Sequence, residues 1–142
     1  MTSAPHRPRT ALIVLTVWVL LQLPRFIAVP LIQSVLAGHD PAAWLFPAII
    51  DIVVAVAGLP LIVLAWTRPA LATWVYALLW LSLSMFDHAS AITAFAIAGV
   101  PTIFADMGGG GPTVPAIQTA LDLAVFALLC RQGVRTHFLE RV

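Results

Sequence analysis

Residues 82–90 read SLSMFDHAS and place an acid, Asp87, directly beside an imidazole, His88. The segments on both sides are built mainly of Leu, Ala, Trp and Ile. Ionisable residues at membrane depth are costly and therefore mark sites of function or of specific packing. If the flanking segments span a membrane, this pair is the first candidate site in the chain.

The amino-acid composition is typical of an integral membrane protein. The 142 residues are 61% hydrophobic and only 9% charged, whereas about a quarter of the residues in a soluble domain are charged. So few charges do not cover a water-exposed surface, and lipid is the natural solvent. A net charge of +1 gives no basic face for nucleic acid. The lone Cys130 excludes an internal disulfide and a Cys-x-x-Cys motif.

The hydropathy pattern predicts an all-α bundle of four transmembrane helices in a single membrane domain. The expected helices cover about 10–37, 43–66, 69–99 and 113–130, with short tails at 1–9 and 131–142. Pro24 and Pro30 interrupt the first span, which predicts a kink near Pro24 or an end soon after Pro30. A signal peptide cleaved after Ala37 is the alternative, but this apolar run exceeds the usual ~7–15 residues.

Two segments outside these spans carry their own predictions. Residues 100–112 contain the glycine run Gly108 to Gly111 and are expected to form a flexible outer loop. The run lacks the Gly-Lys-Ser/Thr sequence of a phosphate-binding loop. The polar, mildly amphipathic tail at 131–142 is expected to lie on the membrane surface.

The arginines predict the orientation of the chain in the membrane. Six of the seven fall on one side of a four-pass topology, and the positive side of a membrane protein is the cytoplasmic one. Both termini are therefore expected in the cytoplasm. Abundant Ala and Arg with no Lys suggests a GC-rich bacterial genome and hence the bacterial inner membrane. The six residues are Arg7, Arg9, Arg68, Arg131, Arg135 and Arg141.

Each residue of an α-helix advances the chain by ~1.5 Å. Counted in this way, Arg25, Asp51, Asp87 and Asp122, from four different helices, all lie in the outer half of the bilayer. Polar residues three or four positions away share their helix faces. We expect these residues to line one polar pocket in a four-helix bundle. No catalytic or metal-ligating residue is predicted. The predicted ligand-binding residues are Arg25, Asp51, Ser84, Asp87, His88, Gln118 and Asp122.

Electrostatics limits what this pocket holds, because a charge at the bilayer centre costs about 2.5–3.5 kcal/mol even on lenient scales. Arg25 is expected to neutralise one acid, with Asp51 or Asp122 as the favoured partner. A remaining acid is then protonated, paired with His88 or matched to a bound cation. In the alternative reading the third helix ends at Phe86, and Asp87 and His88 lie in water.

Three functions remain open at this point. The favoured one is a multi-pass membrane protein whose outer pocket binds or passes a small ligand, a proton or a cation. The second is a structural or accessory subunit of a homo-oligomer or a larger membrane complex. The third is a membrane enzyme that uses a neutral carboxylic acid on a lipid or isoprenoid. The sequence favours a non-enzymatic role and leaves any cofactor unknown, since His88 is the only histidine placed at haem-ligating depth.

Overall fold

The computed structural model describes residues 7–106 and 111–139, and all regular structure within these ranges is helical. This confirms the all-α prediction for the described part of the chain. The elements are α1 (Arg7–Leu21), η1 (Leu23–Ile27), α2 (Ala28–Leu36), η2 (Ala42–Trp44), α3 (Leu45–Thr67), α4 (Leu71–Ala98), α5 (Thr102–Asp106), α6 (Thr113–Leu129) and α7 (Gln132–Leu139).

Three segments are long and apolar enough to cross a membrane: Arg9–Leu36, Ala42–Thr67 and Leu71–Ala98, of 28, 26 and 28 residues. A fourth is reached only if α6 and α7, which are bent by 64° relative to each other, form one span. The 17 residues of α6 make about 25 Å of helix, slightly less than the hydrocarbon thickness of about 30 Å. α6 coincides with the fourth predicted span, 113–130, and the bend falls where the tail was predicted to begin.

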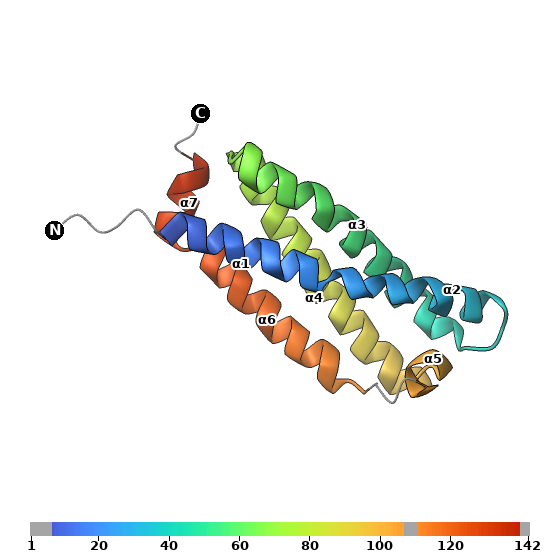
Figure 1. Ribbon diagram of the computed structural model, residues 1–142. Helices are drawn as coiled ribbons and strands as arrows, with labels where there is room; N and C mark the ends of the chain where they lie inside the picture. Colours follow the sequence, from blue (N-terminus) through green and yellow to red (C-terminus); the bar gives the residue numbers. More distant parts are fainter. Residues whose placement is uncertain (1–6, 107–110, 140–142) are drawn as a thin grey trace.

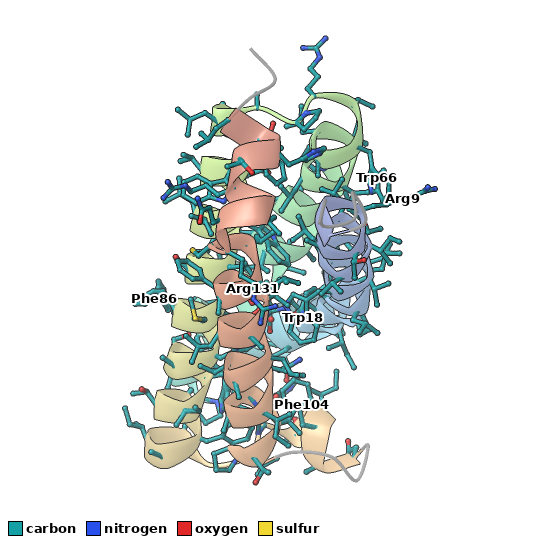
Figure 2. All side chains as sticks on the ribbon, turned by 90° about the vertical axis from the view of Figure 1, so that its left-hand side faces the viewer. Arg9, Trp18, Trp66, Phe86, Phe104 and Arg131 are labelled. Carbon is teal, nitrogen blue, oxygen red and sulfur yellow. The ribbon has the colours of Figure 1, made fainter. Side chains whose placement is uncertain are left out.

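The long helices run side by side along one bundle (Figure 1). The beginning of α1, the end of α3 and α7 lie at one end, and α5 lies at the other end with the turn that follows α2. In the side view, Arg9 and Trp66 lie toward the first end and Phe104 toward the second (Figure 2). The indole N–H of Trp66 donates to the hydroxyl of Thr16 at 2.8 Å, which ties α3 to α1 near that end.

The first predicted helix, 10–37, is broken by the 3-10 segment η1, which contains Pro24. A 3-10 helix turns about 120° per residue, whereas an α-helix turns about 100°. Five residues of η1 therefore rotate α2 by about 100° relative to a continuous helix. The rotation lets α2 pack against α3 and η2, and Arg25 in η1 lies buried inside the bundle. The predicted kink near Pro24 corresponds to this break.

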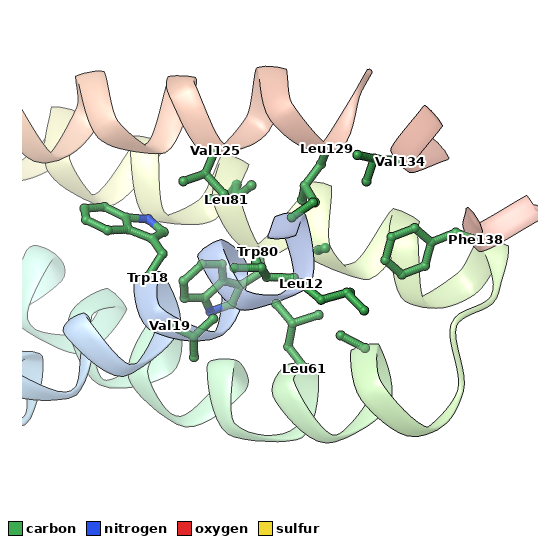
Figure 3. Close-up of a cluster of buried hydrophobic side chains, with 14 of the residues drawn as sticks. Leu12, Trp18, Val19, Leu61, Trp80, Leu81, Val125, Leu129, Val134 and Phe138 are labelled. Carbon is green, nitrogen blue, oxygen red and sulfur yellow. The ribbon is translucent and has the colours of Figure 1, made fainter. Parts of the chain in front are cut away.

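A large apolar cluster holds the termini end of the bundle together (Figure 3). It includes Trp18 of α1, Trp80 of α4 and Leu129 of α6, all buried. Val134 and Phe138 of α7 point into the same cluster. The tail at 131–142 was expected on the membrane surface, but its described part packs an apolar face against the bundle. An amphipathic pattern does not distinguish between these two partners.

Close approach of three helices depends on a glycine. A Cβ built on Gly58 of α3 would lie 2.6 Å from Cγ1 of Val19 in α1 and 3.4 Å from the Trp80 ring in α4. The small-residue face expected in this helix is therefore used for packing, as glycines commonly are in membrane bundles.

The helix that carries the central stretch is continuous from Leu71 to Ala98, and it ends at Gly99, whose φ of +73° an L side chain rarely adopts. Asp87 and His88 lie well inside it, 2% and 3% exposed. The alternative in which this helix ends at Phe86 is therefore wrong. Of the predicted glycine loop, residues 107–110 lie outside the described ranges, while residues 102–106 form α5.

The bundle is apolar on its outer surface and encloses a polar group within a mainly apolar interior. Large apolar side chains such as Leu36, Leu79 and Ile97 are 72%, 63% and 74% exposed. Exposed large apolar side chains come from α1, α2, α3, α4 and α6. The buried interior contains a group of polar side chains, namely Gln22, Arg25, Ser84, Asp87, His88 and Asp122.

Candidate functional site

The guanidinium of Arg25 lies at the centre of the buried polar group, and its side chain is 6% exposed. Arginine has five N–H donors, one on Nε and two on each terminal nitrogen. Each has a partner in the bundle. Nε donates to Gln22 Oε1 at 2.7 Å, Nη1 to Asp51 Oδ1 at 2.7 Å and to Asp87 Oδ2, and Nη2 to Ser84 Oγ at 2.8 Å and to His88 Nε2 at 2.5 Å. The guanidinium has no donor left for an added anion.

The contact with Arg25 fixes the proton on His88. A guanidinium only donates, so Nε2 of His88 must accept and carries no hydrogen. The imidazole is therefore neutral, with its proton on Nδ1. That nitrogen lies 3.2 Å from Oδ2 of Asp122, although the two groups are not aligned as a hydrogen bond. His88 thus connects the Arg25 cluster to a second buried acid.

Asp122 of α6 is the most enclosed acid, with no exposed surface. Its Oδ1 accepts a 2.6 Å hydrogen bond from the indole N–H of Trp18 in α1. Its Oδ2 faces His88 Nδ1. An ionised carboxylate in this position is stabilised by one strong donor and by the imidazole. Asp122 therefore pairs with His88 and Trp18, not with Arg25 as one reading of the sequence expected.

The charges of the cluster do not balance. Arg25 supplies one positive charge, and the two acids that it contacts, Asp51 and Asp87, together with Asp122 supply three negative charges when ionised. His88 is neutral in this arrangement. Oδ1 of Asp87 is buried and has no hydrogen-bond partner among the residues that the structure describes. With all three acids ionised the site has an excess of negative charge, and in either state it contains a buried carboxyl oxygen without a partner in the described part of the chain.

A cavity of about 310 Å³ lies against this cluster. Asp51 is the acid with open surface on this side, its side chain being 27% exposed. The polar floor consists of Arg25, Asp51, Asp87 and His88, with Gln118 of α6 also in the lining. The walls are apolar and include Leu31, Trp44, Phe95, Phe104, Val114 and Pro115. The cavity combines an acidic floor with a large apolar and aromatic wall.

Aromatic rings and α5 close the end of this cavity that is remote from α7. Trp44 packs edge-on against Phe95 and Phe104, with ring centroids 4.7 and 6.2 Å apart. The indole N–H of Trp44 donates to the carbonyl of Gly99 at 3.2 Å. Phe104 belongs to α5, so this short helix forms part of the wall.

Asp40 attaches α5 to the end of α2. Its carboxylate accepts hydrogen bonds from Ser34 Oγ at 2.6 Å and from the backbone N–H and Oγ1 of Thr102, both at 2.8 Å. The side chain is buried. The hydrogen bond from Ser34, with those from Thr102, holds the pKa of Asp40 below its ordinary value against the opposing effect of burial. These bonds to the ionised carboxylate fix the position of α5 over the cavity.

The structure brings the predicted site residues together. Arg25 contacts Asp51, Ser84, Asp87 and His88 directly. Asp122 joins through His88, and Gln118 lines the cavity. Their role as ligand-binding residues stays a prediction.

Sequence reasoning missed Trp18, and it noted Gln22 only as a neighbour of Arg25. Trp18 lies four positions before Gln22, so the two share one helix face. That spacing was the available signal. Trp44 and Phe104 were also missed as wall residues. The two rings meet because Phe104 lies in α5, a short helix that was not predicted beside the glycine run.

Within the described ranges, no group of three or more His, Cys, Asp or Glu side chains is arranged to hold a metal ion. No protein-family model, curated protein or solved structure matches the chain. The function must therefore be argued from the site itself.

Proposed function

We propose that the chain is a multi-pass protein of the bacterial inner membrane, with both termini in the cytoplasm. The apolar outer surface and the three long apolar segments support insertion. Arg9, Arg68, Arg131 and Arg135 lie at or next to the ends of helices that meet at the α7 end of the bundle. The positive-inside rule assigns that end to the cytoplasm. The cavity then lies in the outer half of the bilayer.

We further propose that the cavity binds a small organic cation and not an anion. The saturation of Arg25 carries this proposal, because all five of its donors already have partners in the bundle. An anion would have to displace a carboxylate from the guanidinium. A cation instead compensates the excess negative charge beside Asp51 and Asp87, which low dielectric makes costly.

The walls favour an organic cation with an apolar part. Trp44, Phe95 and Phe104 supply aromatic surface beside the acids. A cation held against an aromatic ring gains about 0.5–2 kcal/mol. Ligand cavities are commonly of this size and combine apolar walls with a few polar groups that fix orientation.

A thermal-stability experiment tests this proposal with benzyltrimethylammonium, whose charge does not depend on pH. We expect the cation to raise the unfolding temperature of the detergent-purified protein, because a ligand that binds only the folded state stabilises it. Asp51→Asn should weaken binding about tenfold, or about 1.4 kcal/mol, because it removes the most exposed acid of the floor. Asp106→Asn is the matched control, since Asp106 is exposed and does not line the cavity.

The second candidate is a structural subunit, which the same saturated Arg25 network favours. A network with every guanidinium donor satisfied is also what a packing device needs. In that case benzyltrimethylammonium does not stabilise the wild-type protein, and Asp51→Asn affects assembly alone. Either result decides between the two candidates.

A further inference from the structure

The contact between Arg25 Nη2 and His88 Nε2 depends on the protonation of the imidazole. At 2.5 Å, the guanidinium nitrogen donates into the lone pair of Nε2. A proton added to Nε2 fills that lone pair and turns the acceptor into a donor. Two positively charged donors then face each other at contact distance, which is strongly unfavourable in a buried site. The observed arrangement therefore exists only while His88 is neutral.

We propose that His88 is a proton-binding site that competes with the cation in the cavity, with the Arg25 guanidinium as the element that moves between them. The inference rests on the proposed cation-binding function. When Nε2 takes a proton, Nη2 loses one of its two acceptors and keeps Ser84, and repulsion from the imidazolium shifts the guanidinium toward Asp51 and Asp87. Those acids are then more fully neutralised by Arg25 and hold a ligand cation less well.

The groups around His88 favour this exchange. Asp122 of α6 lies 3.2 Å from Nδ1 and stabilises an imidazolium. The uncharged indole of Trp18 in α1 holds that carboxylate in place. On the opposite side stand Arg25 of η1, Asp51 of α3 and Asp87 of α4. The proton moves from solvent in the cavity to Nε2, Nδ1 keeps its hydrogen, and no bond between heavy atoms changes.

Linkage makes the effect reciprocal. A cation on Asp51 and Asp87 repels the guanidinium toward His88, where it needs an unprotonated Nε2. Cation binding therefore releases a proton, and a proton on His88 lowers the affinity for the cation. Affinity for the cation should therefore rise with pH.

Titration calorimetry with benzyltrimethylammonium at several pH values tests the proposal. For the wild-type protein we expect the dissociation constant to fall as pH rises, by up to about tenfold per pH unit for one linked proton. In His88→Gln the amide oxygen still accepts from Arg25 but takes no proton, so the pH dependence should largely disappear. His39→Gln is the matched control, because it removes an exposed imidazole that does not line the cavity and should leave the pH dependence unchanged.

Proton release by the wild-type protein keeps the test valid if His88→Gln does not fold. Binding heats measured in buffers of different ionisation enthalpy give the number of protons released, and we expect a value near one at a pH where His88 is charged in the free protein. Binding with no proton release and no pH dependence overturns the exchange and leaves the cation site standing. Unchanged pH dependence in a folded His88→Gln also overturns it. No binding at any pH overturns the proposed function as well.

Discussion

The indole N–H of Trp18 donates a 2.6 Å hydrogen bond to Oδ1 of Asp122, a residue 104 positions later in the chain. The acceptor is completely buried. Trp18→Phe should therefore leave a buried carboxylate oxygen without its donor, at a cost of about 1–3 kcal/mol. Reversible unfolding in mixed micelles measures this difference in the free energy of unfolding.

Trp66→Phe provides the control for that prediction. Trp66 also donates an indole hydrogen bond, at 2.8 Å to Thr16, but at an exposed position. Loss of an exposed hydrogen bond leaves groups that other partners can satisfy, so the free energy of unfolding should change by less than about 0.5 kcal/mol. Equal losses in the two variants would show that the buried bond to Asp122 has no special importance.

Gly58→Ala should destabilise the bundle although alanine is the better helix former. The added Cβ would lie 2.6 Å from Cγ1 of Val19, a buried and β-branched side chain with little freedom to move. Overpacking of this kind costs about 1–3 kcal/mol. The same unfolding measurement checks the prediction.

Two further variants isolate the steric cause. Val19→Ala in the Gly58→Ala background removes the clashing methyl groups, so the double variant should recover part of the lost stability. Gly133→Ala in α7 meets nothing within 4 Å and should not destabilise the protein. If Gly58→Ala is as stable as the wild-type protein, α1, α3 and α4 do not pack as closely as described.

The attachment of α5 should weaken in acid. The folded-state pKa of Asp40 lies below its ordinary value, chiefly because of the hydrogen bond from Ser34. The stabilisation that ionised Asp40 gives to the α5 attachment is therefore fully present above the unfolded pKa of about 3.9. It is lost as the pH falls below that value through the folded pKa. Hydrogen exchange of the α5 amides between about pH 5 and pH 3 measures this, after correction for the intrinsic exchange rate.

Asp40→Asn should lower protection of α5 at about pH 5, because the amide is uncharged and cannot accept all three hydrogen bonds as strongly. The α5 amides of this variant should then lose little further protection from hydrogen exchange when the pH is lowered. Asp106→Asn serves as the control for general acid effects, since Asp106 is exposed. An Asp40→Asn variant with the acid response of the wild-type protein would show that another group holds α5.

The sequence predicted the helical class and the meeting of four ionisable residues because both depend on local quantities. Apolar run length sets the spans, and helix rise places Arg25, Asp51, Asp87 and Asp122 at similar depths. The pairing within the cluster did not follow. Arg25 reaches Asp87 as well as Asp51 because η1 rotates the chain at Pro24. That rotation has no unambiguous sequence signal.

The parts that sequence reasoning missed depend on tertiary contacts. The attachment at Asp40 requires the start of α5 to meet the end of α2. Asp40 and its partner Thr102 are 62 residues apart in the chain. An apolar face at Val134 and Phe138 fits a membrane surface or a bundle equally well, and the bundle contacts decide it. Depth counting brought Asp122 to the level of the other ionisable residues but could not show that Trp18, from another helix, would donate to its Oδ1.

The central claim is that an acidic cavity beside a saturated arginine binds cations. Calorimetric titration of the wild-type protein with benzyltrimethylammonium and with benzenesulfonate, at about pH 8, tests it most directly. The two probes share one aromatic ring and differ in the sign of a permanent charge. Saturable binding of the cation, with no measurable binding of the anion, is the predicted result. Binding of benzenesulfonate with equal or higher affinity, or no binding of the cation, would contradict the account.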